Sequence, residues 1–363
     1  MINKNDILTY LKELEVDDLV KNLQIMGNKI ILDMVSHSPA MHEKKRLELG
    51  IKNAFEDKFG NEIDLKLTIL VEVPEQNQIK GKQIPGIKNI IAIASGKGGV
   101  GKSTVTSNLA ISLKNMGFSV GILDADIYGP SIPTMFDTEK EKPISINVEG
   151  KNKMQPIESY GIKMLSIGFF SGMNQAVVWR GPMASKALQQ MIHDAHWGEL
   201  DFLLIDLPPG TGDIHLSIVQ QLPITGAVIV STPQNVALAD VKKGVAMFQM
   251  EAINVPVLGL VENMAYFTPV ELPENKYYIF GKDGVKNLAE ILDVPFLGEI
   301  PLIQSIREAG DVGRPAAMQE NSIIADIYDE IAKKTIESLV KRNENLPPTE
   351  IVRITTMAGC STK

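Results

Sequence analysis

A glycine-rich segment at residues 96–104 most constrains what this chain can fold into. It follows an apolar run at 90–94 and reads Gly-Lys-Gly-Gly-Val-Gly-Lys-Ser-Thr. The segment fits the pattern G-x-x-x-x-G-K-[ST], in which a loop with little side-chain bulk surrounds the phosphates of a nucleotide with backbone N–H groups. A helix is expected over 108–114, so that the phosphates lie at a helix N-terminus, where free N–H groups favour anions. The sequence therefore predicts a P-loop between a strand and a helix.

The side chains of this loop have expected roles as well. Lys102 is expected to reach the β- and γ-phosphates, and the Ser103 hydroxyl is expected to bind Mg²⁺. The residues expected to contact the nucleotide are Gly96, Lys97, Gly98, Gly99, Val100, Gly101, Lys102, Ser103 and Thr104. These types and their spacing predict a Mg²⁺-dependent nucleotide hydrolase or switch.

Three aspartates close apolar runs of strand length elsewhere in the chain: Asp124 and Asp126 close one run, and Asp206 closes another. Ligands of open parallel sheets bind at the carboxyl ends of the strands, so these aspartates are candidates for the same site. Asp206 is expected to hold Mg²⁺ through water, opposite Ser103. Asp124 and Asp126 are two residues apart and face the same side if the strand geometry persists, so one could orient a water and the other the metal shell. The simpler alternative for each is a carboxylate at a strand end or helix cap.

The predicted fold is an α/β protein with a mostly parallel sheet flanked by helices, preceded by a small α/β domain. Residues 1–73 are expected to form the small domain and 89–345 the P-loop domain. The segment between them, 74–88, is polar and rich in glycine and proline, so it is expected to be a linker. Two prolines near the end of the chain predict a mobile tail over 346–363.

Beyond the P-loop, apolar runs of strand length alternate with helical stretches, which is typical of parallel βαβ units. Strands are expected at 119–123, 162–167, 202–205, 227–230, 257–261 and 296–297, and helices at 184–196, 214–221, 236–251, 284–292 and 323–342. In the small domain, helices are expected at 7–14 and from Ser38 and Pro39 to Gly60, and strands at 29–35 and 65–71.

Composition excludes several classes of function. The formal charge of -8 and the pI near 5.3 argue against a dedicated nucleic-acid-binding protein. The chain has no apolar run long enough for a membrane span and no secretory signal, so a cytoplasmic protein without a membrane partner is expected. The single cysteine, Cys360, excludes an intrachain disulfide and a Cys₄ metal site within one chain.

Lys97, directly after the first glycine, gives the loop a resemblance to the deviant P-loop of the MinD, ParA and nitrogenase iron protein superfamily. In that superfamily the early lysine reaches the partner's phosphates in a dimer that sandwiches the nucleotides. The resemblance therefore implies a homodimer in which Lys97 acts catalytically across the interface, together with Lys102 on its own side. The alternative for Lys97 is a solvated charge in a loop.

Four further stretches resemble the Mrp/ApbC family of iron-sulfur cluster carrier ATPases, over about residues 88–340. They read Asp-Ala-Asp-Ile-Tyr-Gly-Pro-Ser-Ile-Pro at 124–133, Val-Trp-Arg-Gly-Pro-Met at 178–183, Asp-Leu-Pro-Pro-Gly-Thr-Gly-Asp at 206–213 and Val-Glu-Asn-Met at 261–264. Residues 1–73 also resemble the small α/β domain that often precedes this ATPase. The resemblance implies hydrolysis of ATP and transfer of iron-sulfur clusters to apoprotein clients.

The resemblance also implies roles for single residues. It favours Asp126 for orienting the attacking water and Asp124 for the metal shell, because the Asp-x-Asp pair of MinD-like proteins lies on a switch loop. Asn263 occupies the position of the asparagine that hydrogen-bonds adenine in this superfamily. The alternative for Asn263 is an ordinary turn residue at a strand end.

The chain departs from the family at one important place. Family members usually carry Cys-x-x-Cys shortly after the Val-Glu-Asn-Met stretch, where two subunits together hold a cluster, but residues 265–275 contain no cysteine. Glu271 and Glu274 are hard oxygen donors and are poor ligands for such a cluster. Cys360 is then the one possible thiolate ligand, and the alternative is an idle thiol.

Two other classes stay open at this point. A MinD- or ParA-like switch would couple ATP-driven dimerisation to a membrane or DNA, although neither the tail nor the charge supplies a basic surface. A small-molecule ATP enzyme, such as an amide ligase of the dethiobiotin synthetase kind, is disfavoured by the stretches at 179–182 and 206–213. We expect a homodimeric ATPase of the cluster-carrier family whose cluster ligation is altered or lost.

Overall fold

The computed structural model describes residues 4–14, 16–26, 28–36, 41–60, 63–71, 84, 86–170, 181–212, 215, 218–219, 222–269, 271–319 and 321–347. The chain forms two compact units, of which the first consists mainly of residues 1–78 and the second mainly of residues 79–343. Most of the expected linker and tail lie outside the described residues, as do the expected helix start at Ser38 and Pro39 and much of the helix expected at 214–221.

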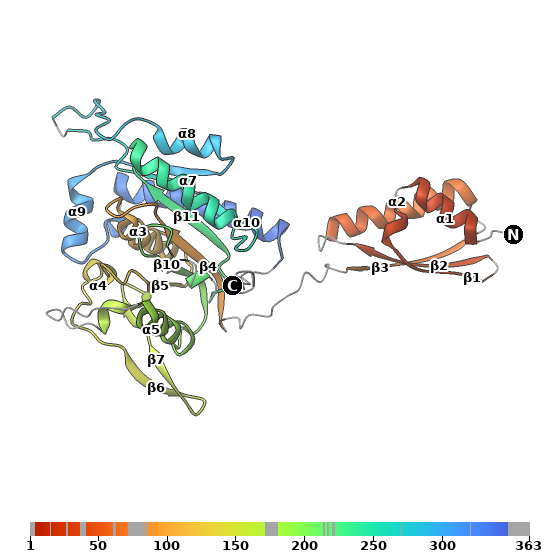
Figure 1. The fold of residues 1–363 in the computed structure, drawn as a ribbon, viewed down its shortest axis with the longest axis horizontal. Coiled ribbons are helices and arrows are strands. Elements are labelled where there is room, and N and C mark those ends of the chain that lie inside the picture. The colour runs from red at the N-terminus through yellow and green to blue at the C-terminus, as the bar shows by residue number, and fades with distance from the viewer. Residues whose placement is uncertain are drawn as a thin grey trace, which may run out of the picture. The chain divides into compact units, whose positions relative to one another are not determined.

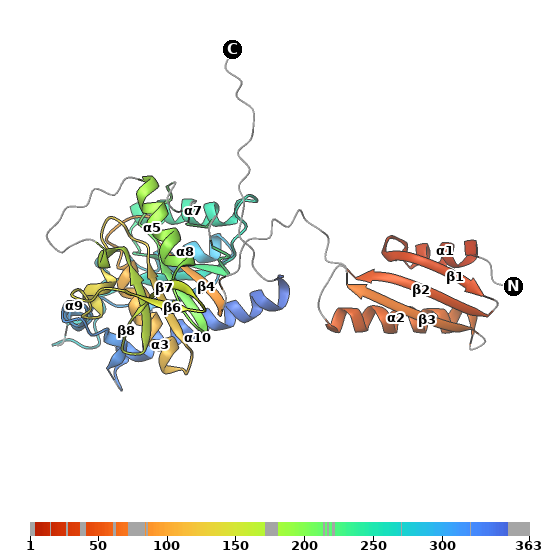
Figure 2. The same ribbon diagram turned by 90° about the horizontal axis from the view of Figure 1, so that it is seen from below.

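The N-terminal unit is a three-stranded sheet covered by two helices. Its elements are α1 (Lys4–Glu13), a 3₁₀ turn (Asp17–Leu19), β1 (Val20–Met26), β2 (Lys29–Ser36), α2 (Met41–Phe59) and β3 (Asp64–Val71). The strand order is β1-β2-β3, with the first pair antiparallel and the second parallel. Figures 1 and 2 show both helices on the same face of this sheet, where Leu11 and Phe55 pack on Leu32.

The sequence predicted β2, β3 and both helices of this unit but not β1. In β3, exposed residues alternate with more buried ones, as the spacing of Leu65, Leu67 and Ile69 predicts. Helix α2 ends just before Gly60, whose φ of +71° supports the predicted stop. Strand β1 was missed because polar residues interrupt its apolar pattern, and its pairing to β2 contains a register shift.

The larger unit is built on an eight-stranded sheet with the order β13-β12-β11-β4-β10-β5-β9-β8. The strands are β4 (Ile87–Ala94), β5 (Val120–Asp124), β8 (Ile157–Ser159), β9 (Ile162–Ser166), β10 (Leu200–Asp206), β11 (Gly226–Ser231), β12 (Val257–Asn263) and β13 (Phe296–Ile300). All neighbouring pairs are parallel except β8 and β9. The predicted mostly parallel sheet is therefore confirmed.

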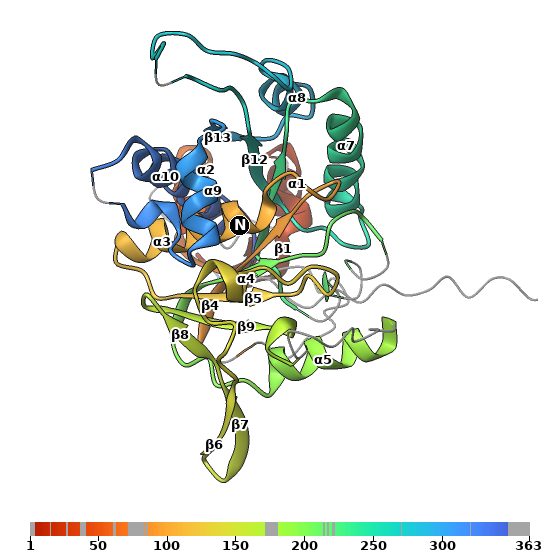
Figure 3. The ribbon, with the colours of Figure 1, turned by 90° about the vertical axis from the view of Figure 1, so that its left-hand side faces the viewer.

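Helices cover both faces of this sheet, as Figure 3 shows. One face packs against α5 (Gly181–His193), α7 (Asn235–Gln249) and α8 (Gly284–Ile291), and the other against α3 (Lys102–Asn115) and α10 (Ile323–Asn345). Burial on both faces explains why β4, β5, β10 and β11 are almost continuously apolar rather than alternating.

Several short elements were not predicted. They are α4 (Ile132–Met135), β6 (Ile144–Val148), β7 (Lys151–Gln155), β8, α9 (Gln304–Asp311) and the 3₁₀ turns Ile167–Phe169 and Ala316–Met318. Strand β4 also begins at Ile87, inside the expected linker. None of the helices within the described ranges is long and apolar enough to cross a membrane.

The topology determines where the functional groups meet. Strand β10 inserts between β4 and β5, so the strands that lead to the P-loop, Asp206 and Asp124 are direct neighbours. In the register, Asp206 pairs with Ile93 on one side and with Asp124 on the other. The two aspartates therefore lie side by side at the carboxyl edge, next to the P-loop.

Candidate nucleotide-binding site

The P-loop joins β4 to α3 as the sequence predicts. The helix begins at Lys102 itself, so Lys102 and Ser103 stand in its first turn. Gly99 and Gly101 have φ values of +78° and +82°, a region that favours glycine. At Gly96 a side chain is excluded by close packing instead, because an added Cβ would lie 2.6 Å from the backbone of Asp240 in α7.

A hollow of about 220 Å³ opens over this loop. It is lined by Ser95, residues 98–104, Asp126, Ser131, Met135 and Pro209. The loop residues expected to contact phosphates therefore surround one cavity, except for Gly96 and Lys97, which are not part of its lining. Its position at a helix N-terminus, with backbone N–H groups free of side-chain bulk, suits an anionic ligand.

Asp206 is the centre of the polar contacts in this site, and its side chain is fully buried. Ser103 Oγ donates to Asp206 Oδ2 at 2.5 Å, and Thr106 Oγ1 donates to Oδ1 at 2.7 Å. Lys102 Nζ lies 2.8 Å from Asp206 Oδ1 and 4.0 Å from Asp126 Oδ2. The structure thus brings together Lys102, Ser103, Asp126 and Asp206, four of the residues that the sequence singled out.

Asp124 has a different environment from Asp126. It is fully buried and accepts hydrogen bonds from Ser166 Oγ at 2.8 Å and from the Ile132 amide at 3.3 Å. Burial, with a further contribution from the charge of Asp206, raises the pKa of Asp124 to about 7. Because it accepts from the Ile132 amide, the Asp124 side chain also fixes the start of α4.

Asp126 lies beyond the end of β5, so the strand alternation that could place both aspartates on one side does not reach it. Its Oδ1 accepts hydrogen bonds from the amides of Tyr128 and Gly129 at 3.1 and 3.2 Å. These bonds close a turn, and they leave Oδ2 on the side of Lys102. Asp126 is therefore the carboxylate of the pair that lines the loop cavity.

Lys97 points away from the cavity lining. Its Nζ donates to Oε1 of Gln234, the residue that precedes α7, at 3.2 Å. A lysine held by a neutral amide at the rim of the site is free to exchange that bond for a stronger one to a phosphate.

Asn263 stands at the end of β12, directly against the P-loop. Its Nδ2 donates to the Val100 carbonyl at 2.8 Å, which leaves the Oδ1 acceptor for a ligand. A second hollow, of about 570 Å³, extends from Gly101 and Thr104 past Asn263 to residues of α9. Its size and largely apolar lining suit a nucleoside next to the phosphate cavity.

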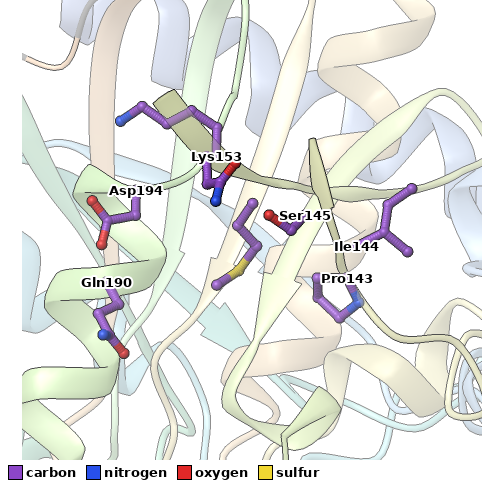
Figure 4. A pocket seen from close by; sticks show the side chains of 8 residues that line it. Pro143, Ile144, Ser145, Lys153, Gln190 and Asp194 are labelled. Carbon is purple, nitrogen blue, oxygen red and sulfur yellow. The ribbon is translucent and has the colours of Figure 1, made fainter. Parts of the chain in front are cut away.

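A third hollow, of about 270 Å³, lies away from the P-loop between α5 and the β6–β7 hairpin. Figure 4 shows Gln190 of α5, and Asp194 directly after this helix, near the strands that carry Ser145 and Lys153. The Lys153 ammonium is already bonded to the His193 carbonyl at 2.7 Å. Among the described lining residues, the one cation is therefore already held by a backbone carbonyl.

Aromatic contacts involve the stretch after Asn263, in which the family resemblance would place Cys-x-x-Cys. The rings of Tyr266 and Tyr278 pack edge to face with 6.2 Å between their centroids. Lys276 Nζ lies over the Tyr266 ring, 3.9 Å from its centroid. Within the described residues, no three His, Cys, Asp or Glu side chains are grouped so that they could hold a metal ion. Cys360 lies outside the described residues.

Sequence reasoning missed three contributors to the site. Thr106 could have been found, because it lies one helical turn after Lys102 and so faces the same strand edge. Ser166 and Gln234 gave no such signal. Their contacts with Asp124 and Lys97 join segments that are far apart in the chain.

Comparison with known proteins agrees with this geometry. The sequence model of the ParA family, described as NUBPL iron-transfer P-loop NTPase, matches residues 86–336. The chain belongs to this family of P-loop NTPases. Its P-loop site therefore hydrolyses nucleoside triphosphates.

Named relatives of this chain align over most of their length. An "Iron-sulfur cluster carrier protein" of Aquifex aeolicus is 41% identical over 92% of this chain and 99% of its own length. The Escherichia coli protein of the same name is 48% identical over 73% of this chain and 70% of its own length. A Dictyostelium discoideum "Iron-sulfur cluster transfer protein NUBPL" is 47% identical over 74% of this chain and 83% of its own length. The predicted resemblance to the Mrp/ApbC carriers is confirmed.

Solved structures agree with the fold. A nucleotide-binding protein of Archaeoglobus fulgidus in complex with ADP has a TM-score of 0.56 and 40% identity, covering 64% of this chain and 89% of its own. The cell division ATPase MinD of Pyrococcus furiosus has a TM-score of 0.51 at 24% identity, covering 69% of this chain and 99% of its own. The latter likeness supports the fold alone.

Proposed function

We propose that this chain is a Mg²⁺-dependent ATPase that carries iron-sulfur clusters to apoproteins as a cytoplasmic homodimer, with cluster ligands that differ from Cys-x-x-Cys. The observation that carries the ATPase part is the group formed by Lys102, Ser103 and Asp126 around Asp206 beside the P-loop cavity. The carrier part is supported by relatives named as carriers that align with most of the chain.

The donors present fit Mg²⁺. Ser103 Oγ and Asp206 Oδ2 face each other, and hydroxyl and carboxylate oxygens are the ligands that this ion takes in P-loop enzymes. Mg²⁺ would neutralise phosphate charge as the terminal phosphoryl group leaves. In the structure Lys102 supplies positive charge to Asp206, and we infer that it moves to the β- and γ-phosphates when the metal arrives.

The remaining residues then have distinct tasks. Asp126 orients the attacking water from the rim of the cavity, and Asp124 holds the preceding loop and contributes to the metal shell. Asn263 accepts a hydrogen bond from the 6-amino group of adenine through Oδ1, because its Nδ2 is bound to Val100. Guanine has an acceptor at that position, so this orientation favours ATP over GTP. Lys97 reaches the partner's phosphates in the dimer.

Anaerobic reconstitution with iron and sulfide, followed by iron counting and visible absorption, tests cluster carriage. We expect a labile cluster that depends on Cys360, because no other thiolate exists in the sequence. Cys360→Ser should therefore abolish incorporation and spare ATP turnover. If the serine variant takes up as much iron as the parent, the Cys360 assignment fails.

The second candidate function is an ATP-driven dimerisation switch or scaffold without a cluster. The observation that favours it is the cysteine-free segment after Asn263, where aromatic and lysine side chains contact one another. If neither the parent nor the serine variant takes up iron and sulfide while both hydrolyse ATP, this second function is the correct one. Lys102→Ala serves as the control, since it should abolish turnover in either case.

A further inference from the structure

His215 is a buried titratable residue that has no part in the proposed ATPase mechanism. It follows the loop after Asp206, and it is 1% exposed. Its backbone N–H donates to the Gly212 carbonyl at 3.0 Å. A histidine that is buried this close to a phosphate site needs a structural reason.

The imidazole holds the backbone of Pro208. It is hydrogen-bonded there, and since proline has no N–H, the ring donates and the Pro208 carbonyl accepts. Nε2 has no partner among the residues that the structure describes, so the donor is Nδ1. Burial, helped by the charge of Lys102, lowers the pKa of His215 to about 4, and the ring is therefore neutral near pH 7.

The loop that His215 holds reaches the phosphate cavity. The Leu207 amide donates to Ile93 at 3.1 Å, and the Gly210 amide donates to Ser95 at 3.0 Å. Between these two bonds lie Pro208 and Pro209, which have no N–H to donate. Pro209 nevertheless lines the cavity with Lys102 and Asp126. A side chain can therefore fix these two prolines only through a backbone carbonyl, and His215 binds that of Pro208.

We propose that His215 is a positioning residue for ATP hydrolysis: its Nδ1–H fixes the Pro208 carbonyl and thereby holds Pro209 and Gly210 against the P-loop. The inference rests on the ATPase part of the proposed function. His215 does not touch the nucleotide, so its effect is on the geometry of the cavity wall during turnover rather than on ATP affinity. A small displacement of a wall that contacts the reacting phosphate is enough to slow turnover.

Two variants separate this role from simple packing. His215→Asn keeps an N–H donor near the position of Nδ1 but loses volume, whereas His215→Met keeps volume and loses the donor. We expect His215→Asn to keep kcat within about twofold, and His215→Met to lower kcat at least about fivefold, the effect of one buried hydrogen bond, with KM for ATP little changed in both. A packing role predicts the reverse order.

Every other outcome overturns the proposal. Equal kcat in the two variants, whether retained or lost, would show that the donor does not matter. A raised KM at unchanged kcat would place His215 in nucleotide binding. Thermal melting of both variants shows which of them is folded at the assay temperature.

Hydrogen exchange gives a readout that needs no turnover. The Gly210 amide is bonded to Ser95, so a loosened loop should exchange it faster. We expect faster exchange of the peptide containing Gly210 in His215→Met than in the parent and in His215→Asn, without nucleotide. Unchanged exchange in the methionine variant would refute the positioning role. If the parent hydrolyses no ATP, the proposed function fails, and the exchange experiment still decides the role of His215.

Discussion

At the scale of single residues, the site depends on charge balance around Asp206. Asp206 and Asp124 are fully buried neighbours on adjacent strands, and Lys102 is the cation in contact with Asp206. The raised pKa of Asp124 reflects this shortage of positive charge, because burial and Asp206 both disfavour its ionised form. A divalent cation at Ser103 and Asp206 would correct the balance and release Lys102 for phosphate. Binding of Mg²⁺ and of the triphosphate should therefore be strongly cooperative.

Asp126→Asn tests which carboxylate acts on water. The asparagine keeps an Oδ1 acceptor for the Tyr128 and Gly129 amides, so the turn should persist. Because the negative charge is lost, we expect ATP hydrolysis to fall about 100-fold or more, with ATP affinity changed far less. Phosphate release and fluorescent-nucleotide titration measure the two quantities. Asp194→Asn, at an exposed position away from the P-loop, is the matched control. An equal loss of affinity would instead assign Asp126 to binding or structure.

Asp201 gives a prediction on stability and pH. Its carboxylate accepts from Lys88 Nζ at 2.7 Å and from the Ser119 amide and hydroxyl at 2.9 Å, which joins the starts of β4, β10 and β5. These hydrogen bonds, that from Lys88 first, lower the pKa of Asp201 to about 2. Because the pKa of Asp201 is lower in the folded state than in the unfolded state, where it is near 4, the ionised carboxylate stabilises the fold above pH 4. This contribution is lost as the pH falls towards 2.

Asp201→Asn should therefore lower the melting temperature at pH 7 by roughly 2–4 °C, and its difference from the parent should narrow between pH 4 and pH 2. Urea unfolding at several pH values checks this, with Asp194→Asn as the control. A difference that stays constant down to pH 2 would show that the Asp201 charge is not what stabilises this edge of the sheet.

At the scale of elements, the P-loop is placed by helices that belong to different parts of the chain. Helix α3 carries Lys102 and Ser103, while α7 packs directly on Gly96 and Gln234, just before α7, holds Lys97. Strand β12 brings Asn263 against Gly101. The loop is thus fixed by contacts from three elements, which suits a site that must keep its shape while nucleotides exchange.

This arrangement explains what the sequence could and could not predict. The P-loop, the parallel sheet and the strand-end aspartates follow from local spacing and from the rule that ligands bind at the carboxyl ends of strands. Elements α4 and β8 are short and β7 is largely polar, so their patterns carry little signal. Strand β6 does alternate apolar and polar residues, and this signal was overlooked. The contacts of Lys97 with Gln234 and of Asp124 with Ser166 depend on strand order, which one sequence does not reveal.

Gly101→Ala tests the close packing of β12 on the P-loop. The residue has φ of +82°, and an added Cβ would overlap with Asn263 Nδ2. We expect a loss of about 1–3 kcal/mol in the free energy of unfolding and much weaker ATP binding. Gly98→Ala is the control for folding, because its Cβ would meet Pro209 at 3.8 Å, an ordinary contact. The measurements are urea unfolding and nucleotide titration. Equal stability of the two variants would contradict the tight contact at Gly101.

At the scale of the whole molecule, ATP turnover and cluster carriage make separate demands on the chain. The groups that we propose for turnover are brought together within one subunit, except for Lys97, whose ammonium donates to Gln234 and which does not line the phosphate cavity. Cluster carriage depends on thiolates, and the sequence provides one, Cys360. A homodimer would therefore supply both a second Lys97 for catalysis and a second thiolate for a cluster. In the proposed function, dimer formation is the common requirement of both activities.

Lys97→Ala tests whether dimer formation is required, because it leaves Cys360 and the other P-loop residues unchanged. Because Lys97 does not line its own phosphate cavity, ATP binding by the monomer should be nearly unchanged, whereas Lys102→Ala should weaken it. ATP-dependent dimer formation should be lost, and turnover should fall at least about tenfold, since a charge that stabilises the transferred phosphoryl group is missing. Light scattering with a non-hydrolysable ATP analogue measures the dimer, and phosphate release measures turnover. A Lys97→Ala protein that dimerises and hydrolyses ATP like the parent would show that Lys97 is a solvated loop charge, and the sandwich dimer would then lose its main support in the sequence.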